Sequence, residues 1–213
     1  MDLGDLAALI ILVPFLFGLF RYKYFNESLK WLFGFVSYGV LNEISTLVFY
    51  YFDFNDTMPK RHLYTFISFL CLGLFYNSLF RGFFRKNWIL IIVILFEVYF
   101  LINSFFIHSI YEYPGLDRSI SIIIVILFSV LYFYKTMVEA KVKDLFNEPL
   151  IWINAAILIY YSGNLFFNIL FKIIFEYSHE FGKLTFLYLK ILNAVFYILI
   201  TVGFLKIKTT TAK

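Results

Sequence analysis

The chain has 213 residues; 62% are apolar, 23% are aromatic and 15% are charged, and the net charge is +4. A water-soluble domain carries about 45–50% apolar and about 25% charged residues, so this composition excludes an ordinary soluble globule. The single cysteine, Cys71, excludes an intrachain disulfide and a multi-cysteine metal site. The composition therefore predicts an integral membrane protein that lies in a lipid bilayer.

Seven apolar stretches follow one another along the chain. A helix needs roughly 20 apolar residues to cross a bilayer core about 30 Å thick, and each stretch meets or approaches that length. The alternation of apolar and polar residues that is typical of a membrane β-barrel is absent from the sequence. We therefore expect an all-α, polytopic bundle of seven transmembrane helices, with residues 1–213 in a single transmembrane domain. The expected spans are Leu6–Phe20, Trp31–Phe52, His62–Phe80, Trp88–Ile107, Ile120–Met137, Leu150–Phe171 and Leu184–Leu205.

Two local patterns concern the sixth span. Asn147 precedes Glu148 and Pro149, which predicts an N-cap at Asn147 and a proline in the first turn. The triplet Ser162-Gly163-Asn164 lies in the middle of the span. It indicates either a kink or a place where the backbones of two helices approach closely.

The basic residues set the orientation of the bundle, because cytoplasmic loops carry an excess of Lys and Arg. With the connections assigned alternately to the two sides, one side receives twelve basic residues and the other receives five. The twelve are Arg21, Lys23, Lys30, Arg81, Arg85, Lys86, Lys135, Lys141, Lys143, Lys206, Lys208 and Lys213; the five are Lys60, Arg61, Arg118, Lys172 and Lys183. The N-terminus is therefore expected outside and the C-terminus in the cytoplasm.

Three ionisable residues interrupt the predicted spans near mid-depth: Glu43, Glu97 and Lys190. At a rise of 1.5 Å per residue, each lies roughly 9–15 Å from the outer end of its span. Asn164 and Asn193 fall at the same depth. Because a charge inside the bilayer costs at least about 2.5–3.5 kcal/mol, such residues are candidates for a function.

Helical spacing favours a shared interior for these groups. Lys190, Asn193 and Tyr197 recur on one face of the seventh span, and Tyr161 and Asn164 lie on one face of the sixth. One interpretation is an outward-facing polar cavity for a ligand or a coupled proton. The other is structural, with hydrogen bonds between helices and an ion pair between Lys190 and one glutamate. Two glutamates and one lysine leave one carboxylate without a cation, which favours the cavity.

Metal and enzyme chemistry find little support in the sequence. The three histidines, His62, His108 and His179, lie at the outer boundary, and no pair has the i, i+4 spacing of a helical zinc motif, so we expect neither a metal nor a cofactor. With no Asp or His expected inside a span, an intramembrane zinc hydrolase is disfavoured, and an enzyme stays the weaker alternative. The basic charge is explained by topology, so no nucleic-acid partner is expected.

Two segments resemble a known family. They are WINAAILIYYSGNLFF (Trp152 to Phe167) and HLYTFISFL (His62 to Leu70). Together they are similar to a family of small seven-helix membrane proteins found in Bacteroidetes. The resemblance implies a bacterial cytoplasmic (inner) membrane, and it supplies no catalytic residues.

Two functions follow from this topology and polar layer. The first is a sensor or receptor-like subunit that signals through a separate cytoplasmic protein, because the chain shows no output domain of its own. The second is a small-solute or proton-coupled transporter in which Glu43 or Glu97 titrates. Transporters more often show internal repeats and broken helices, and only the Ser162-Gly163 pair hints at a break. The sequence leaves the ligand and the oligomeric state open.

Overall fold

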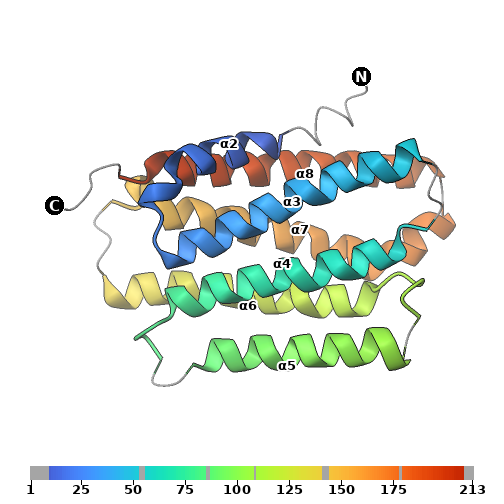
Figure 1. Ribbon diagram of the computed structural model, residues 1–213, viewed down its shortest axis with the longest axis horizontal. Coiled ribbons are helices and arrows are strands. Elements are labelled where there is room, and N and C mark those ends of the chain that lie inside the picture. Colours follow the sequence, from blue (N-terminus) through green and yellow to red (C-terminus); the bar gives the residue numbers. More distant parts are fainter. Residues whose placement is uncertain are drawn as a thin grey trace. The chain divides into compact units, whose positions relative to one another are not determined.

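The computed structural model describes residues 10–52, 56–84, 87–107, 109–140, 144–177 and 179–208, without the side chains of 169–183 and 186. Within these residues every named element is helical (Figure 1). Three short elements are η1 (Tyr22–Tyr24), a π-helical turn η2 (Asn103–Ile107) and η3 (Leu145–Asn147). The α-helices are α2 (Leu12–Arg21), α3 (Glu27–Tyr51), α4 (Met58–Leu79), α5 (Trp88–Ile102), α6 (Gly115–Glu139), α7 (Pro149–Tyr177) and α8 (His179–Lys206).

Six of these helices are long and apolar enough to cross a membrane. They correspond to the second to seventh predicted spans, and their ends differ from the predicted ones by a few residues. The six are Glu27–Tyr51, Met58–Leu79, Trp88–Ile107, Gly115–Glu139, Pro149–Asn168 and Leu187–Lys206. The first predicted span, Leu6–Phe20, overlaps the ten-residue helix α2, and its beginning lies outside the described residues. The crossing by that span therefore stays a prediction.

The chain divides into two compact units, which are described here separately. Unit 1 contains residues 1–25 and 122–213, and unit 2 contains residues 26–121. Helix α6 begins in unit 2 and continues in unit 1.

Unit 2 is built around the antiparallel helices α3, α4 and α5, which lie side by side (Figure 1). Asn26 begins α3 by accepting a hydrogen bond from the Leu29 N–H at 3.0 Å. Contacts between α3 and α4 then run in opposite chain directions: Glu27 with Arg81, Gly34 with Cys71 and Tyr38 with Tyr64. Helix α4 pairs with α5 in the same manner, through Gly73 with Val93, Phe69 with Phe96 and Phe66 with Phe100.

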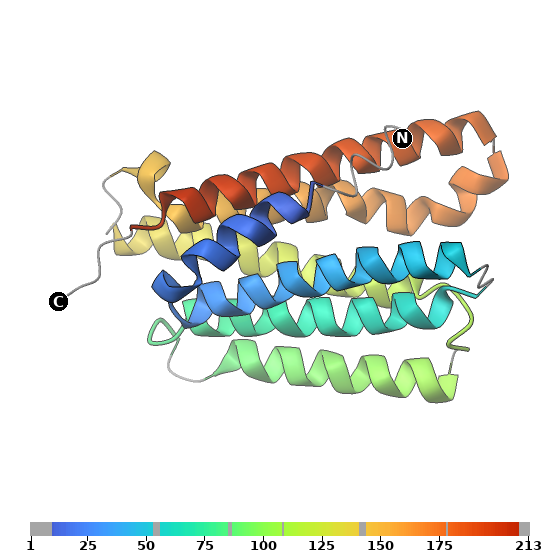
Figure 2. The ribbon, with the colours of Figure 1, turned by 45° about the horizontal axis from the view of Figure 1, so that its top comes forward.

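Unit 1 is built on α8, which packs along α7 and against α2 (Figure 2). Two glycines bring α7 and α8 close together. A Cβ on Gly163 would lie 2.5 Å from a methyl carbon of Leu192, and one on Gly203 would lie 2.6 Å from Ile153. Helix α7 continues without interruption through Ser162-Gly163-Asn164, so the triplet serves close packing.

The prediction that Asn147 caps α7 is wrong. Asn147 ends the short helix η3, its amide donates to Asp144 Oδ2 at 2.6 Å, and its oxygen accepts from Lys206 Nζ at 2.8 Å. Asn147 is the last residue of η3, and Glu148 stands between it and Pro149, where α7 begins, so Asn147 is not at the N-cap position of α7. Asp144 caps η3 by accepting from the Phe146 N–H at 3.1 Å.

Candidate functional site

Glu97 is the most unusual polar residue of unit 2. It lies on the buried face of α5 with Val93, Phe96 and Phe100, and 7% of its surface is exposed. Neither carboxyl oxygen has a hydrogen-bond partner among the residues that the structure describes. Buried polar groups are nearly always satisfied, so an unpartnered carboxyl inside an apolar helix requires an explanation.

The surroundings of Glu97 do not compensate a negative charge. The titratable group that interacts with it electrostatically is the thiol of Cys71 on α4. At the same level of α4, Ser68 donates its hydroxyl to the Tyr64 carbonyl at 2.5 Å, and Thr65 donates to the Arg61 carbonyl at 3.0 Å. The hydrogens of these two hydroxyls are therefore used in bonds to carbonyls of their own helix. An ionised carboxylate at this position would be both desolvated and unpaired, which costs several kcal/mol.

Glu43 has a different environment. It is half-buried on α3, and the positive charge of Lys60 on α4 acts on it. The ammonium of Lys60 also contacts the hydroxyl of Thr46, one turn further along α3. Sequence reasoning missed this partner because Lys60 was assigned to the connection before the third span, whereas α4 already begins at Met58. Of the two glutamates, Glu97 is thus the one with no cation beside it among the described residues of unit 2.

The remaining predicted site residues belong to unit 1. Asn164 is buried and donates to the Tyr160 carbonyl one turn earlier, at 2.9 Å. Tyr197 is buried, Asn193 and Tyr161 are half-buried, and Lys190 is exposed. The prediction that these residues share one layer with Glu43 and Glu97 concerns both units, and it stays a prediction.

A second polar cluster, which we call the Asp117 latch, lies where α5 ends and α6 begins. Asp117, in the first turn of α6, is 4% exposed. Its Oδ1 and Oδ2 accept from the Asn103 amide at 2.8 and 2.7 Å, and Oδ1 also accepts from the Tyr99 hydroxyl at 3.0 Å. Two hydrogen bonds from Asn103 thus tie the start of α6 to the π-helical turn η2, and one from Tyr99 ties it to the end of α5.

His62 makes a parallel connection beside this latch. Its Nδ1 lies 3.0 Å from Ser104 Oγ, and its Nε2 lies 3.0 Å from the carbonyl oxygen of Glu112. Because a carbonyl only accepts, we assign the ring proton to Nε2, which leaves Nδ1 to accept the Ser104 hydroxyl in the neutral ring. The buried imidazole therefore joins α4 to η2 and to the segment that follows it.

These two clusters correct one sequence prediction. Asp117 and His62 were assigned to connections or boundaries, and no Asp or His was expected inside a span. In the structure both lie within membrane-length helices and both are buried. A signal for Asp117 was present, since Pro114-Gly115 marks a helix start three residues before it. The pairing of His62 with Ser104 joins residues 42 positions apart and had no local signal.

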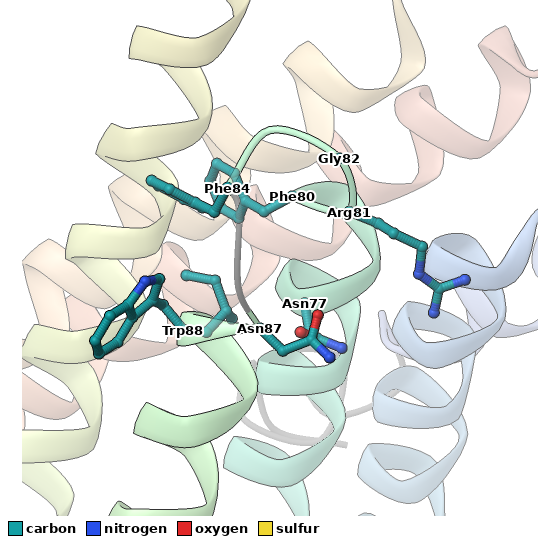
Figure 3. Close-up of a pocket in the computed structure, with 8 residues that line it drawn as sticks. Asn77, Phe80, Arg81, Gly82, Phe84, Asn87 and Trp88 are labelled. Atoms are coloured by element: carbon teal, nitrogen blue, oxygen red, sulfur yellow. The ribbon is translucent and has the colours of Figure 1, made fainter.

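No group of three or more potential metal ligands occurs among the described residues. His108 and the side chain of His179 lie outside them, so the predicted absence of a metal is untested for those two. At the opposite end of unit 2, a small pocket of about 20 Å³ lies beside the turn that joins α4 to α5 (Figure 3). Asn77 and Asn87 approach each other in it, while Arg81 points away and pairs with Glu27 at 2.7 Å. It has room for about one water molecule and is not the candidate site.

Comparison with family models, curated proteins and solved structures finds no match for the chain. The class of protein therefore follows from the fold itself. A bundle with six helices of membrane-crossing length and apolarity is that of a multi-pass integral membrane protein.

Proposed function

We propose that the protein is a sensor or receptor-like subunit of a bacterial inner membrane whose state is set by the proton on Glu97. A separate cytoplasmic protein would read that state. The observation that supports the proposal is the carboxyl of Glu97, nine-tenths buried and without a hydrogen-bond partner among the described residues.

A carboxyl in such an environment couples protonation to conformation. The neutral acid is tolerated among Phe96, Phe100 and Val93, whereas the carboxylate calls for water or a cation. Loss of the proton therefore favours any rearrangement that hydrates Glu97, and gain of the proton favours the closed packing. The proton then acts as a ligand that binds one of two states more tightly, which is the requirement for a switch.

The position of Glu97 connects it to the predicted cytoplasmic side. Helix α5 begins at Trp88, directly after the basic segment Arg81 to Lys86, and α4 ends just before that segment. A shift of α5 against α4 would therefore move this basic turn, which a cytoplasmic protein can contact. Helix α6, which begins at the Asp117 latch, continues into unit 1 and offers a second route.

A proton-coupled transporter is the second candidate, because the same carboxyl would serve as its titrating group. Transporter sites are typically formed by discontinuous helices. The structure shows α7 as continuous through the one place where the sequence indicated a break. This observation removes the one sign of a broken helix that the sequence offered for the transporter.

Carbodiimide labelling in lipid nanodiscs tests the proposal. A protonated carboxyl in apolar surroundings transfers its proton to a hydrophobic carbodiimide and adds through oxygen to the carbodiimide carbon. The O-acylisourea then rearranges to a stable N-acylurea, which mass spectrometry locates. We expect an adduct on Glu97 that decreases as the pH rises, with no adduct on that peptide in Glu97→Gln. Glu43→Gln is the matched control and should leave the Glu97 adduct unchanged. Failure of Glu97 to react at any pH would overturn the proposal.

A second measurement separates the two functions. Proteoliposomes that hold a pH-sensitive dye report proton flux under an imposed pH gradient. The sensor predicts no flux beyond that of empty vesicles, together with pH-dependent hydrogen exchange in residues 80–88 that Glu97→Gln abolishes. A flux that Glu97→Gln removes would support the transporter instead.

A further inference from the structure

The face of α5 that carries Glu97 leads to the His62–Ser104 pair. Glu97, Phe100 and Ser104 are all buried and follow one another at i, i+3 and i+7. At a rise of 1.5 Å per residue, Ser104 lies about 10 Å along the helix from Glu97. Two polar groups on one buried face are thus separated by a single aromatic side chain.

Phe100 occupies the space between them. It is 2% exposed, and its ring centroid lies 5.9 Å from that of His62, 6.4 Å from Phe66 and 6.1 Å from Phe96. The Phe100 ring is thus packed among His62, Phe66 and Phe96, on the buried face between the helix positions of Glu97 and Ser104.

The His62–Ser104 pair has the geometry of a proton relay. In the neutral ring, Nδ1 is the free basic site, and it already faces the Ser104 hydroxyl at 3.0 Å. The Ser104 hydroxyl can pass its hydrogen to Nδ1 while its oxygen takes a proton from water on the outer side, which leaves a neutral hydroxyl and a cationic ring. When Nδ1 returns a proton to the Ser104 oxygen, the hydroxyl releases its own hydrogen through intervening water to the Glu97 carboxylate, and the ring is neutral again.

Charged side chains also lie close to this pair in the sequence and in the structure. Arg61 precedes His62 on α4 and lies over the Tyr113 ring at 5.9 Å, and Arg118 follows the Asp117 carboxylate on α6. Glu112 holds the His62 ring through its main-chain carbonyl. The titratable group that faces Glu97 from α4 is Cys71.

The end of α5 is also the place where the helix is irregular. Asn103 and Ser104 begin the π-helical turn η2, and such turns are often sites of local rearrangement. The Asp117 latch fixes this turn to α6 through Asn103 and fixes the end of α5 through Tyr99, the residue before Phe100. A shift of η2 would therefore move the Ser104 hydroxyl and the Phe100 ring together.

We infer that a proton reaches Glu97 from the His62 end of unit 2, through the His62–Ser104 pair and past Phe100, which acts as a movable plug. This inference rests on the proposed role of Glu97. It adds the side of the membrane from which the proton arrives. That side is the one that the distribution of basic residues places outside the cell.

Infrared spectroscopy of the protein in lipid nanodiscs tests the route. The C=O stretch of the Glu97 acid is identified as the band that Glu97→Gln removes, and its shift after a change from H₂O to D₂O gives the exchange rate of that proton. We expect Phe100→Ala to increase the rate by about tenfold and Ser104→Ala to decrease it by about tenfold, because a positioned relay group contributes at least that much. His62→Gln should also slow the exchange.

Two controls make the result decisive. Phe105→Ala removes an aromatic ring that is 67% exposed, and it should leave the rate unchanged. Ser104→Ala preserves the contact between His62 and Glu112, so it reports on the relay even if His62→Gln fails to fold. Exchange that is indifferent to Phe100 and Ser104 would overturn the route while leaving Glu97 as the titrating group. The absence of any Glu97 acid band would overturn the proposed function itself.

Discussion

Among the described residues, most buried polar side chains bond to their own helix. The amides of Asn154, Asn164 and Asn168 each donate to the carbonyl four residues earlier, at 2.8 to 2.9 Å, and the Thr201 hydroxyl does the same at 2.7 Å. Such bonds let a polar residue sit in an apolar span without a partner helix. A polar face in the sequence is therefore weaker evidence for a cavity than the residues that join helices, such as Asp117 and His62.

The Glu97 carboxyl has no such hydrogen bond to its own helix, which leads to the first prediction. Leucine in its place has nearly the same size and no polar atoms to satisfy. We expect Glu97→Leu to increase the free energy of unfolding by about 1–3 kcal/mol, because the desolvation cost of an unpartnered group is removed. Thermal unfolding in detergent measures the change. Glu43→Leu is the control, and it should not stabilise, because it leaves Lys60 without its partner. A less stable Glu97→Leu variant would indicate that the carboxyl has a structural role.

At the scale of the elements, close helix packing depends on a few glycines. A Cβ on Gly73 of α4 would overlap Cγ2 of Val93 and lie 2.9 Å from its Cγ1. A Cβ on Gly34 of α3 would meet only the Cys71 sulfur, at 3.9 Å. In membranes, where the hydrophobic effect does not drive helices together, such close approaches supply much of the association.

The second prediction compares these two glycines. Gly73→Ala should destabilise the protein by about 1–3 kcal/mol, because overpacking forces α4 and α5 apart. Gly34→Ala should be tolerated. Thermal unfolding of both variants, together with the double variant Gly73→Ala/Val93→Ala, tests the reason: removal of the valine methyls should restore the lost stability. Equal losses in Gly73→Ala and Gly34→Ala would contradict the packing argument.

The third prediction concerns the end of α8. Arg21 Nη1 donates to the carbonyls of Phe204, Leu205 and Ile207 at 3.4, 3.0 and 2.7 Å, and so satisfies groups that a helix C-terminus leaves unpaired. Arg21→Ala should cost about 1–2 kcal/mol and speed hydrogen exchange in residues 203–208. Exchange mass spectrometry measures this directly. Lys23→Ala, which removes the same charge two residues away, should leave that peptide unchanged.

At the scale of the whole molecule, apolar length was a sufficient guide to the helices. Six spans were predicted within a few residues because each is a long, predominantly apolar run. In a bilayer, a helix is the conformation that satisfies the backbone of such a run. Side-chain partners were harder to predict, because they depend on which helices become neighbours. The sequence assigns Lys60 to a connection and Asp117 to the connection before the fifth predicted span, so it misses both the partner of Glu43 and the Asp117 latch. The special character of Glu97 was visible in the sequence as a charge inside a span.

The last prediction tests the orientation of the bundle, on which the outward proton route depends. Twelve basic residues against five place Asn55 outside and Lys208 in the cytoplasm. In a Cys71→Ala background, Asn55→Cys should react with a membrane-impermeant thiol reagent in intact cells, and Lys208→Cys should react only after lysis. The Cys71→Ala protein without an added cysteine measures the nonspecific labelling. The two positions lie on opposite sides of a chain segment with an odd number of spans, so inversion of the bundle would exchange their labelling. Reaction of Lys208→Cys in intact cells would reverse the topology and move the His62 end to the cytoplasmic side.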